Sequence, residues 1–323
     1  MMKMRSPPIR RNDPAKVPEI HSTEACHSFC RHHAWIYHTT LLCLVLLAAD
    51  NVHAVTVTDD QGATIQLEQP ASRIISLAPH TTELLFAAGA GDKIVSAVRY
   101  SYYPEAAKTI PTVGDTNKLD LERIVALAPD LIVAWQSNAA ADTEVLRTLK
   151  IPIYVSEPAS LEAIARSIEA LGILSGSATI AQQASAEFTA RLTRLRENYS
   201  GKPVVSAFYQ FWHDPIFTIN GDHIISAVMQ LCGGRNIFSK MAVLSGQISA
   251  EAVISANPDV IIASAIDANR PPWLDYWQHW PELAAARNGQ IYYIPPDLIQ
   301  RHTPRILDGA AMMCEFIDKA RIK

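Results

Sequence analysis

The segment SLAPHTTELLFAAG (residues 76–89) places polar side chains where an apolar strand meets an apolar helix. His80, Thr81, Thr82 and Glu83 are all of types that can contact a ligand. The carboxyl ends of strands in open parallel sheets form binding crevices. We therefore predict a binding crevice at this junction, and we expect Thr81 or Thr82 to cap the following helix.

Other residues capable of chemistry do not form a catalytic pattern. The sequence GAGDK (89–93) lacks the spacing of a dinucleotide fingerprint, and no G-x-S-x-G elbow occurs. CHSFCRHH (26–33) fits no closed zinc motif well and lies in a proline-broken segment. We therefore expect a binding protein and not an enzyme, without a cofactor or a resident metal.

The amino-terminal 54 residues predict export from the cytoplasm. LLCLVLLAA (41–49) is too short to remain as a membrane span, and Val52 and Ala54 fit the small positions before a cleavage site. We expect a signal peptide over residues 1–54, with an unusually long polar start, that is cut after Ala54. The mature protein is then periplasmic.

The net charge argues against a nucleic-acid-binding function, and the cysteine count bears on disulfide formation. The chain has 323 residues and a formal net charge of −4, so it has no basic excess for binding nucleic acid. Removing the 6 basic and 4 acidic residues of the signal peptide leaves 22 against 28, a net charge of −6. Cys232 and Cys314 remain, and in an oxidising compartment they form either one disulfide or two separate buried thiols.

The elements that position the elbow alternate between buried strands and amphipathic helices. We predict strands at 73–78, 93–98, 130–135, 151–156, 204–210, 216–220, 259–264 and 290–295. We predict helices at 82–89, 121–128, 161–172 and from about Pro304. The alternation indicates an α/β protein with two Rossmann-like lobes, each built on a mostly parallel sheet.

A single long helix interrupts the alternation. No glycine or proline occurs from Ser177 to Tyr199. Apolar residues recur there at helical spacing, namely Ala181, Ala184, Phe188, Leu192 and Leu195. With Ser177 as a cap, this predicts about 22 helical residues, about 33 Å long. We therefore expect lobes at 55–176 and 201–323, joined by a backbone helix at 177–200.

The chain also contains an internal repeat. LDLERIVALAPDLIVAW (119–135) and ISAEAVISANPDVIIAS (248–264) share a glutamate, then Pro-Asp, then a strand. Glu122 and Glu251 fall in the first turn of each helix, where the helix dipole favours an anion. The two glutamates serve either as helix-start charges or in a paired role, one in each lobe.

The order of these segments resembles a known family. The elbow, YSYYP (100–104), the first repeat, the long helix, LCGGRNIF (231–238) and TPRILDGAAMMC (303–314) follow one another as in the helical-backbone (class III) periplasmic substrate-binding proteins. That class delivers iron–siderophores, haem and cobalamin to ABC importers. The similarity covers nearly all of residues 73–320 and is closest to members that bind cobalamin, vitamin B12.

The resemblance implies a cobalamin or related corrinoid ligand, carried as cargo in a cleft between the lobes. Its matching positions imply aromatic contacts from Tyr100, Trp135 and Phe217, and a polar pair, Asp297 and Arg301, that faces ligand amides. His80 is placed at the cleft mouth, either exposed on a loop or in contact with ligand.

The resemblance also implies partners and a disulfide. Cys232 and Cys314 match the disulfide of the family. Glu122 and Glu251 match glutamates that engage arginines on the two membrane-spanning subunits of the ABC importer. We expect a monomer with no nucleic-acid partner.

Two departures from the family pattern leave alternatives open. Thr116 and Ser245 stand where the family has tryptophans, which removes flat apolar cover, and Trp212 is expected to restore part of it. The alternative ligand is haem, with His80, His213, His302 or a tyrosine as an axial ligand, or an iron–siderophore. A receptor that signals in place of transporting is a further alternative, and Asp297–Arg301 could be a surface salt bridge.

Overall fold

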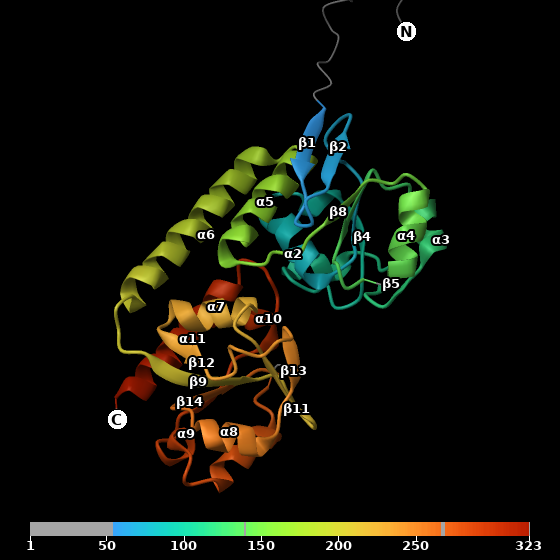
Figure 1. Cartoon of the computed structure of the whole chain (residues 1–323). Helices are drawn as coiled ribbons and strands as arrows, with labels where there is room; N and C mark the ends of the chain where they lie inside the picture. Colours follow the sequence, from blue (N-terminus) through green and yellow to red (C-terminus); the bar gives the residue numbers. More distant parts are fainter. Residues whose placement is uncertain (1–53, 139, 266–268, 323) are drawn as a thin grey trace, which may run out of the picture. The chain divides into compact units, whose positions relative to one another are not determined.

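The computed structural model describes residues 54–138, 140–265 and 269–322. The expected signal peptide lies outside the described residues apart from Ala54, and so does CHSFCRHH. The described chain starts with a hairpin of β1 (Val55–Thr58) and β2 (Thr64–Leu67) and continues into two α/β lobes (Figure 1). Within the described ranges, no helix is long and apolar enough to cross a bilayer.

The amino-terminal lobe is built on a four-stranded parallel sheet in the order β4–β3–β7–β8. Its strands are β3 (Ile74–Ser76), β4 (Ile94–Ala97), β7 (Leu131–Ala134) and β8 (Ile153–Val155). Its helices are α2 (Pro79–Ala87), α3 (Leu121–Ala126), α4 (Ala140–Thr148) and α5 (Leu161–Ser175). A short ribbon of β5 (Gly114–Asp115) and β6 (Lys118–Leu119) lies between β4 and α3 along the chain.

The carboxyl-terminal lobe repeats this architecture with the parallel order β12–β9–β14–β15. Its strands are β9 (Val205–Gln210), β12 (Gly234–Asn236), β14 (Val260–Ala263) and β15 (Ile291–Tyr293). Its helices are α7 (Ile224–Leu231), α8 (Ala250–Ala256), α9 (Ala284–Arg287), α10 (Pro296–Ile299) and α11 (Ile306–Arg321), with a 3₁₀ segment, η3 (Pro272–His279).

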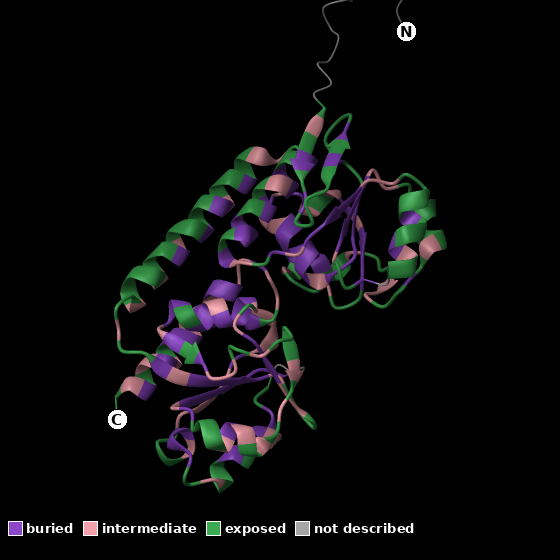
Figure 2. Ribbon diagram, in the orientation of Figure 1, coloured by how far each residue is buried: buried purple, intermediate pink, exposed green. Residues whose placement is uncertain are grey.

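Alternate strand residues bury against opposite helix layers in both lobes. Leu131 and Val133 of β7 belong to the core that includes α2 and α5, whereas Ile132 packs with α3 and α4. This pattern is the consequence of period-two side-chain alternation in a sheet covered on both faces. Figure 2 shows the central strands of both lobes as buried. The predicted fold class, two α/β lobes on mostly parallel sheets, is confirmed.

The predicted strand at 216–220 does not join the central sheet. It forms β11 (Ile216–Ile219), which pairs antiparallel with β10 (Trp212–His213) and β13 (Ser245–Gln247). A short apolar run predicts a strand but not its partners, because pairing depends on where the chain turns.

The long helix is α6 (Ala178–Tyr199), 22 residues long. Its buried residues include the predicted Ala181, Phe188 and Leu192, which belong to one apolar core that also contains residues of both lobes. Figure 1 shows α5 beside α6. A Cβ on Gly172 would lie 2.2 Å from the Ala181 Cβ, so glycine permits this close approach. Ser177 precedes the helix without a side-chain capping bond, since its Oγ donates to the Ala88 carbonyl oxygen.

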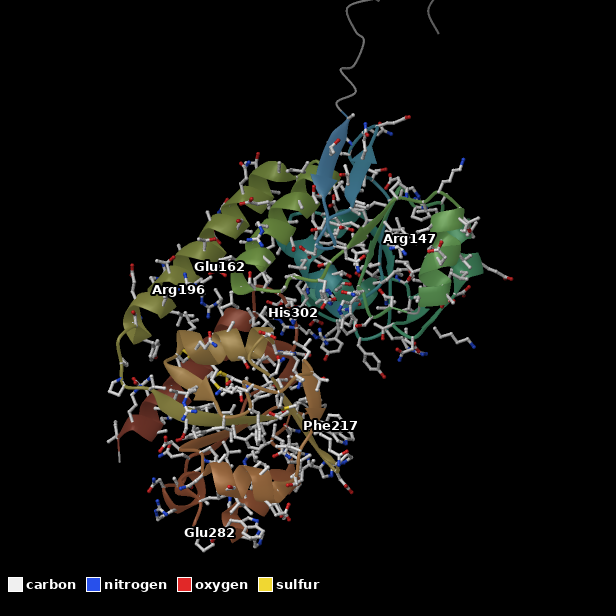
Figure 3. The ribbon with its side chains drawn as sticks, in the orientation of Figure 1. Arg147, Glu162, Arg196, Phe217, Glu282 and His302 are labelled. Carbon is white, nitrogen blue, oxygen red and sulfur yellow. A yellow bond between two sulfur atoms is a disulfide. The ribbon has the colours of Figure 1, made fainter. Side chains whose placement is uncertain are left out.

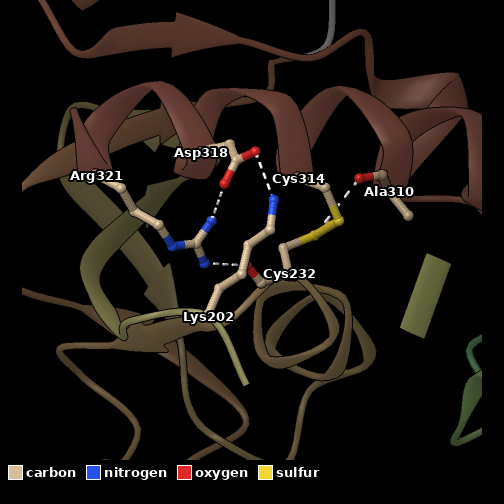
Figure 4. The surroundings of a disulfide bond; sticks show 6 residues. All are labelled: Lys202, Cys232, Ala310, Cys314, Asp318 and Arg321. Carbon is tan, nitrogen blue, oxygen red and sulfur yellow. Dashed lines mark hydrogen bonds and ion pairs between the residues drawn. A yellow bond between two sulfur atoms is a disulfide. The ribbon is translucent and has the colours of Figure 1, made fainter. Parts of the chain in front are cut away.

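A disulfide joins Cys232, at the end of α7, to Cys314 on α11, and both residues are fully buried (Figure 4). The Arg321 guanidinium donates to the Cys232 carbonyl oxygen at 2.6 Å and pairs with Asp318, which also pairs with Lys202. This cluster ties α7, α11 and the entry to β9 together. Of the two alternatives for the cysteines, the structure shows the single disulfide.

Candidate functional site

A cavity of about 650 Å³ is lined by residues of both lobes. The amino-terminal lobe contributes Pro79, His80, Tyr100, Tyr102 and Trp135. The carboxyl-terminal lobe contributes Pro296, Asp297, Gln300, Arg301 and His302. Rings line the first side, and most of the polar groups come from the second, so the cavity offers flat apolar contact and directional hydrogen bonds together.

The segment between β3 and α2 is shorter than the sequence predicts, because the helix starts before residue 82. Helix α2 begins at Pro79, with Ala78 as the residue before it, so neither Thr81 nor Thr82 is the cap. Thr81 is already in the first turn, and its Oγ1 accepts the Ala78 backbone N–H. Both threonine hydroxyls also hydrogen-bond to Ser76 Oγ at 2.7 Å. Proline suits the first helical position because no partner exists there for a backbone N–H.

His80 consequently lies in the helix and is buried, in contrast to the exposed loop position considered from the sequence. Its Nε2 is 3.4 Å from the Ser156 carbonyl oxygen, and its ring stands perpendicular to the Trp135 ring at 5.6 Å. Burial lowers the pKa of His80 to about 3, with smaller contributions from His302 and Arg301. His80 is therefore a neutral imidazole at physiological pH.

His302 enters the cavity from the other lobe (Figure 3). Its ring centroid is 6.5 Å from that of His80. Burial lowers the pKa of His302 as well, although a hydrogen bond with the Pro158 backbone acts in the opposite direction. Two neutral imidazoles, one from each lobe, therefore line the same cavity.

Trp135 directly follows β7 and is fixed from two directions. Its backbone N–H donates to Asn138 Oδ1 at 2.7 Å, and the Asn138 amide donates to the Leu77 carbonyl oxygen at 2.8 Å. Its side chain hydrogen-bonds to Glu157, whose pKa is raised by burial. The indole is thereby held at the carboxyl edge of the sheet before any ligand is present.

Tyr100 reaches the cavity through an unusual backbone conformation. It has φ of +69°, which is uncommon for a bulky residue, and it is 71% exposed. Arg301 Nη2 lies 3.5 Å from the Tyr100 carbonyl oxygen. A large exposed ring on a strained backbone at a cavity is typical of a residue kept for contact with a ligand.

The predicted pair of Asp297 and Arg301 forms, and it belongs to a larger network. Arg301 Nη2 is 2.9 Å from Asp297 Oδ1, and the Arg301 side chain is only 14% exposed, so it is not a surface salt bridge. The Tyr102 hydroxyl donates to Asp297 Oδ2 at 3.0 Å, and the Arg301 guanidinium lies over the Tyr102 ring at 4.9 Å. This second face of the cavity is therefore polar, and its side chains contact one another.

Trp212 and Phe217 do not line this cavity. They are directly opposite each other in the β10–β11 hairpin, and Figure 3 shows Phe217 well apart from His302. The Trp212 indole N–H donates to the Asp214 carbonyl oxygen at 3.0 Å. His213 lines a different cavity, of about 550 Å³, with Trp273, Tyr276 and His279 among its neighbours.

The two predicted docking glutamates are both exposed on short helices. Glu122 lies in the first turn of α3, after Asp120, whose side chain accepts the Arg123 N–H. Glu251 lies in the first turn of α8, after Ser249, whose side chain accepts the Ala252 N–H. The sequence repeat is therefore also a structural repeat with an acidic side chain at the same place in each lobe.

The sequence does not predict the contacts that four further residues make, although all four lie in segments that carry the resemblance. These residues are Glu83, Tyr102, Tyr103 and Arg305. Glu83 accepts hydrogen bonds from Arg301 and Arg305, which are 218 and 222 residues away along the chain. Arg305 also lies 3.8 Å from the Tyr103 ring centroid. No local pattern reveals partners at such separations.

Comparison with known proteins places this arrangement in a family. The model of a periplasmic binding protein family matches residues 74–298. The vitamin B12-binding protein of Vibrio campbellii is 41% identical over 256 residues, which cover 79% of this chain and 92% of that protein.

Two solved structures extend the comparison. The periplasmic vitamin B12 binding protein of Vibrio cholerae superimposes with a TM-score of 0.72 at 37% identity, covering 79% of this chain and 99% of that one. A periplasmic haem-binding protein of Roseiflexus has a TM-score of 0.68 at 21% identity, covering 77% and 99%, and shares the fold. On these findings, the chain belongs to the periplasmic binding protein family.

Proposed function

We propose that this protein captures cobalamin or a related corrinoid in the cavity between its lobes and delivers it to an ABC importer. The observation that carries the proposal is a cavity with aromatic side chains on one side and a charge-balanced polar cluster on the other. The names of the relatives from both Vibrio species support the choice of ligand. Membership in a family of binding proteins also supports binding in place of catalysis.

The charge balance of the site suits such a ligand. Arg301 and Arg305 are offset by Glu83 and Asp297, so the cluster has no strong field of one sign. Cobalamin is a large, nearly neutral macrocycle rimmed by amides, which can accept from a guanidinium and donate to a carboxylate. A strongly anionic ligand would favour an unbalanced basic site instead.

The aromatic side supplies most of the binding free energy in this proposal. Covering one ring face removes on the order of 100 Å² of apolar surface, which contributes about 2.5 kcal/mol. Tyr100, Tyr102 and Trp135 all line the cavity. Three such faces contribute about 7.5 kcal/mol, which is less than the roughly 12.3 kcal/mol of nanomolar binding, so the polar network and further ligand contacts must supply the rest. Trp212 and Phe217 remain predicted contacts for parts of the ligand that extend beyond this cavity.

Calorimetric titration of the purified mature protein tests the ligand. We expect tight binding of cyanocobalamin, weaker binding of cobinamide, which lacks the nucleotide loop, and weak or nonspecific binding of hemin. Tight binding of hemin with no binding of either corrinoid would overturn the proposal.

Haem is the second candidate, because two neutral imidazoles, His80 and His302, line the cavity from opposite lobes. A neutral imidazole is a common axial ligand of haem iron. An absorption spectrum with hemin separates the two readings. Coordination by histidine shifts the Soret band, and a His302→Ala variant should then lose the shift.

We propose further that the protein is exported, that it is a monomer, and that it docks to the importer through both lobes. We infer that the signal peptide is removed after Ala54, and that Glu122 and Glu251 each engage basic residues on one membrane-spanning subunit of the importer. Mass spectrometry of periplasmic protein should give a chain that begins at Val55. Light scattering should give the mass of one chain, and a dimer would contradict the monomer.

A further inference from the structure

Glu83 is a buried carboxylate that receives both arginines of the opposite lobe. Its side chain on α2 is 2% exposed. Oε1 accepts from Arg301 Nη1 at 2.9 Å and from Arg305 Nη2 at 2.6 Å, and Oε2 accepts from Arg305 Nε at 2.9 Å. These charge-assisted bonds cross from the amino-terminal lobe to the segment between α10 and α11.

Each guanidinium is also fixed by a tyrosine of the amino-terminal lobe. Arg301 lies over the Tyr102 ring at 4.9 Å, and Arg305 lies over the Tyr103 ring at 3.8 Å. A planar guanidinium that is hydrogen-bonded to a carboxylate and covered on one face by an aromatic ring has little freedom to turn. Among the described residues, Glu83 is therefore the one carboxylate that contacts both arginines, while Asp297 and the two tyrosines restrain them further.

The two arginines differ in their relation to the cavity. Arg301 lines it, whereas neither Glu83 nor Arg305 is among its lining residues. Any influence of Glu83 on a bound ligand must therefore pass through Arg301 or through the spacing of the lobes. Without Glu83, Arg301 keeps Asp297 on one side but loses the group that holds its Nη1.

We propose that Glu83 is a positioning residue for ligand binding: it holds Arg301 and Arg305 against the amino-terminal lobe and so fixes the Arg301 guanidinium at the cavity wall. The inference rests on the proposed function, because the ligand of Arg301 is taken to be the amide rim of a corrinoid. The proposal predicts that Glu83, which does not line the cavity, controls ligand affinity through Arg301, which does.

Glu83→Gln tests the proposal with little change of shape. The amide keeps one oxygen acceptor but removes the charge and turns an acceptor into a donor facing a guanidinium. We expect cyanocobalamin affinity to fall by about 30-fold in calorimetry, which corresponds to about 2 kcal/mol. Asp308→Asn is the matched control, since Asp308 on α11 pairs with Arg191 at a partly exposed site, and its affinity should stay within twofold.

A double-mutant cycle separates positioning from general structural support. If Glu83 acts through Arg301, Glu83→Gln should add less than threefold to the loss caused by Arg301→Ala. If the two losses multiply in full, or if Glu83→Gln alone leaves affinity within twofold, the proposal is wrong. Circular dichroism and the melting temperature check that each variant folds. If Glu83→Gln does not fold, Arg305→Lys replaces it, because the lysine keeps a positive charge opposite Glu83. We expect an intermediate loss of affinity for Arg305→Lys, and unchanged affinity would count against the proposal.

A readout without ligand keeps this test distinct from that of the function. In ¹⁵N NMR of the ligand-free protein, the Arg305 Nε–H should exchange slowly with water, and Glu83→Gln should make it fast. If wild-type protein binds no corrinoid but shows the protected Nε–H, the proposed function fails, while the fixing of Arg305 by Glu83 stands. An unprotected Nε–H in wild-type protein would show that Glu83 does not fix Arg305 and would overturn the inference itself.

Discussion

The repeated helix–strand units of the two lobes are alike on their outer side and differ at the cavity. Residues 119–135 and 248–264 match at a constant offset, so Asp120 and Ser249 both cap a short helix that carries an exposed glutamate. Asp130 accepts from the Ser72 N–H and Oγ–H, and Asp259 accepts in the same way from Ser206. The same pair of hydrogen bonds thus joins the start of β7 to the segment before β3 and the start of β14 to the start of β9.

The difference appears one residue after each strand. Trp135 follows β7 and lines the cavity, whereas the equivalent residue after β14 is Ser264, which is small and fully buried. A symmetric pair of acidic surface positions suits docking to two equivalent subunits, while a single ligand without such symmetry needs unlike walls. The comparison therefore separates the residues proposed for docking from those proposed for ligand binding.

The largest expected effect is on transport. Changing both Glu122 and Glu251 to lysine should abolish uptake of cobalamin in cells, because two attractive contacts with a basic surface become repulsive. The affinity of the purified variant for cyanocobalamin should remain within twofold of wild type. Uptake at the wild-type rate would contradict docking through these residues.

A smaller but still large effect is expected on ligand affinity. Trp135→Ala should weaken cyanocobalamin binding by about 70-fold, because about 2.5 kcal/mol of apolar contact is lost. Phe217→Ala is the matched aromatic control on the other lobe, and we expect a loss of no more than about fivefold, since Phe217 does not line the cavity. Calorimetry measures both, and equal losses would remove the distinction between the two lobes.

The smallest expected effect is on the pH dependence of stability. His223 accepts the Ile225 N–H at the start of α7, and burial lowers its pKa to about 4. Between about pH 4 and 6.5 the unfolded state therefore binds a proton that the folded state does not, so stability is lost as pH falls through this range. His223→Asn keeps a capping side chain but does not titrate.

We expect this variant to match wild type near pH 7 and to lose less stability toward pH 4.5, by up to about 1.4 kcal/mol per pH unit. Urea unfolding from pH 7.5 to 4.5 measures the difference. His213→Asn serves as the control, because His213 is exposed on the β10–β11 hairpin. Parallel pH profiles for His223→Asn and wild type would show that His223 does not carry this dependence.

Much of the candidate site was implied by the family resemblance, because the segments that carry the resemblance have recognisable local patterns. Tyr100 and Trp135 follow buried strands whose apolar runs are evident, and they line the cavity with His80, Asp297 and Arg301. The position of His80 was not predictable, because the sequence does not show that α2 starts at Pro79 and carries the imidazole inward. Trp212 looks like a cavity aromatic in sequence, but antiparallel pairing with β11 turns its segment into a hairpin.

The sequence by itself determined the two α/β lobes, the 22-residue helix between them and the paired glutamates, because these depend on periodicity and spacing along the chain. Only the tertiary structure decided that Glu83 on α2 meets Arg301 and Arg305. Ion pairs between residues more than 200 positions apart leave no local pattern. They arise because folding brings two buried charges of opposite sign to one place, where neither is stable without the other.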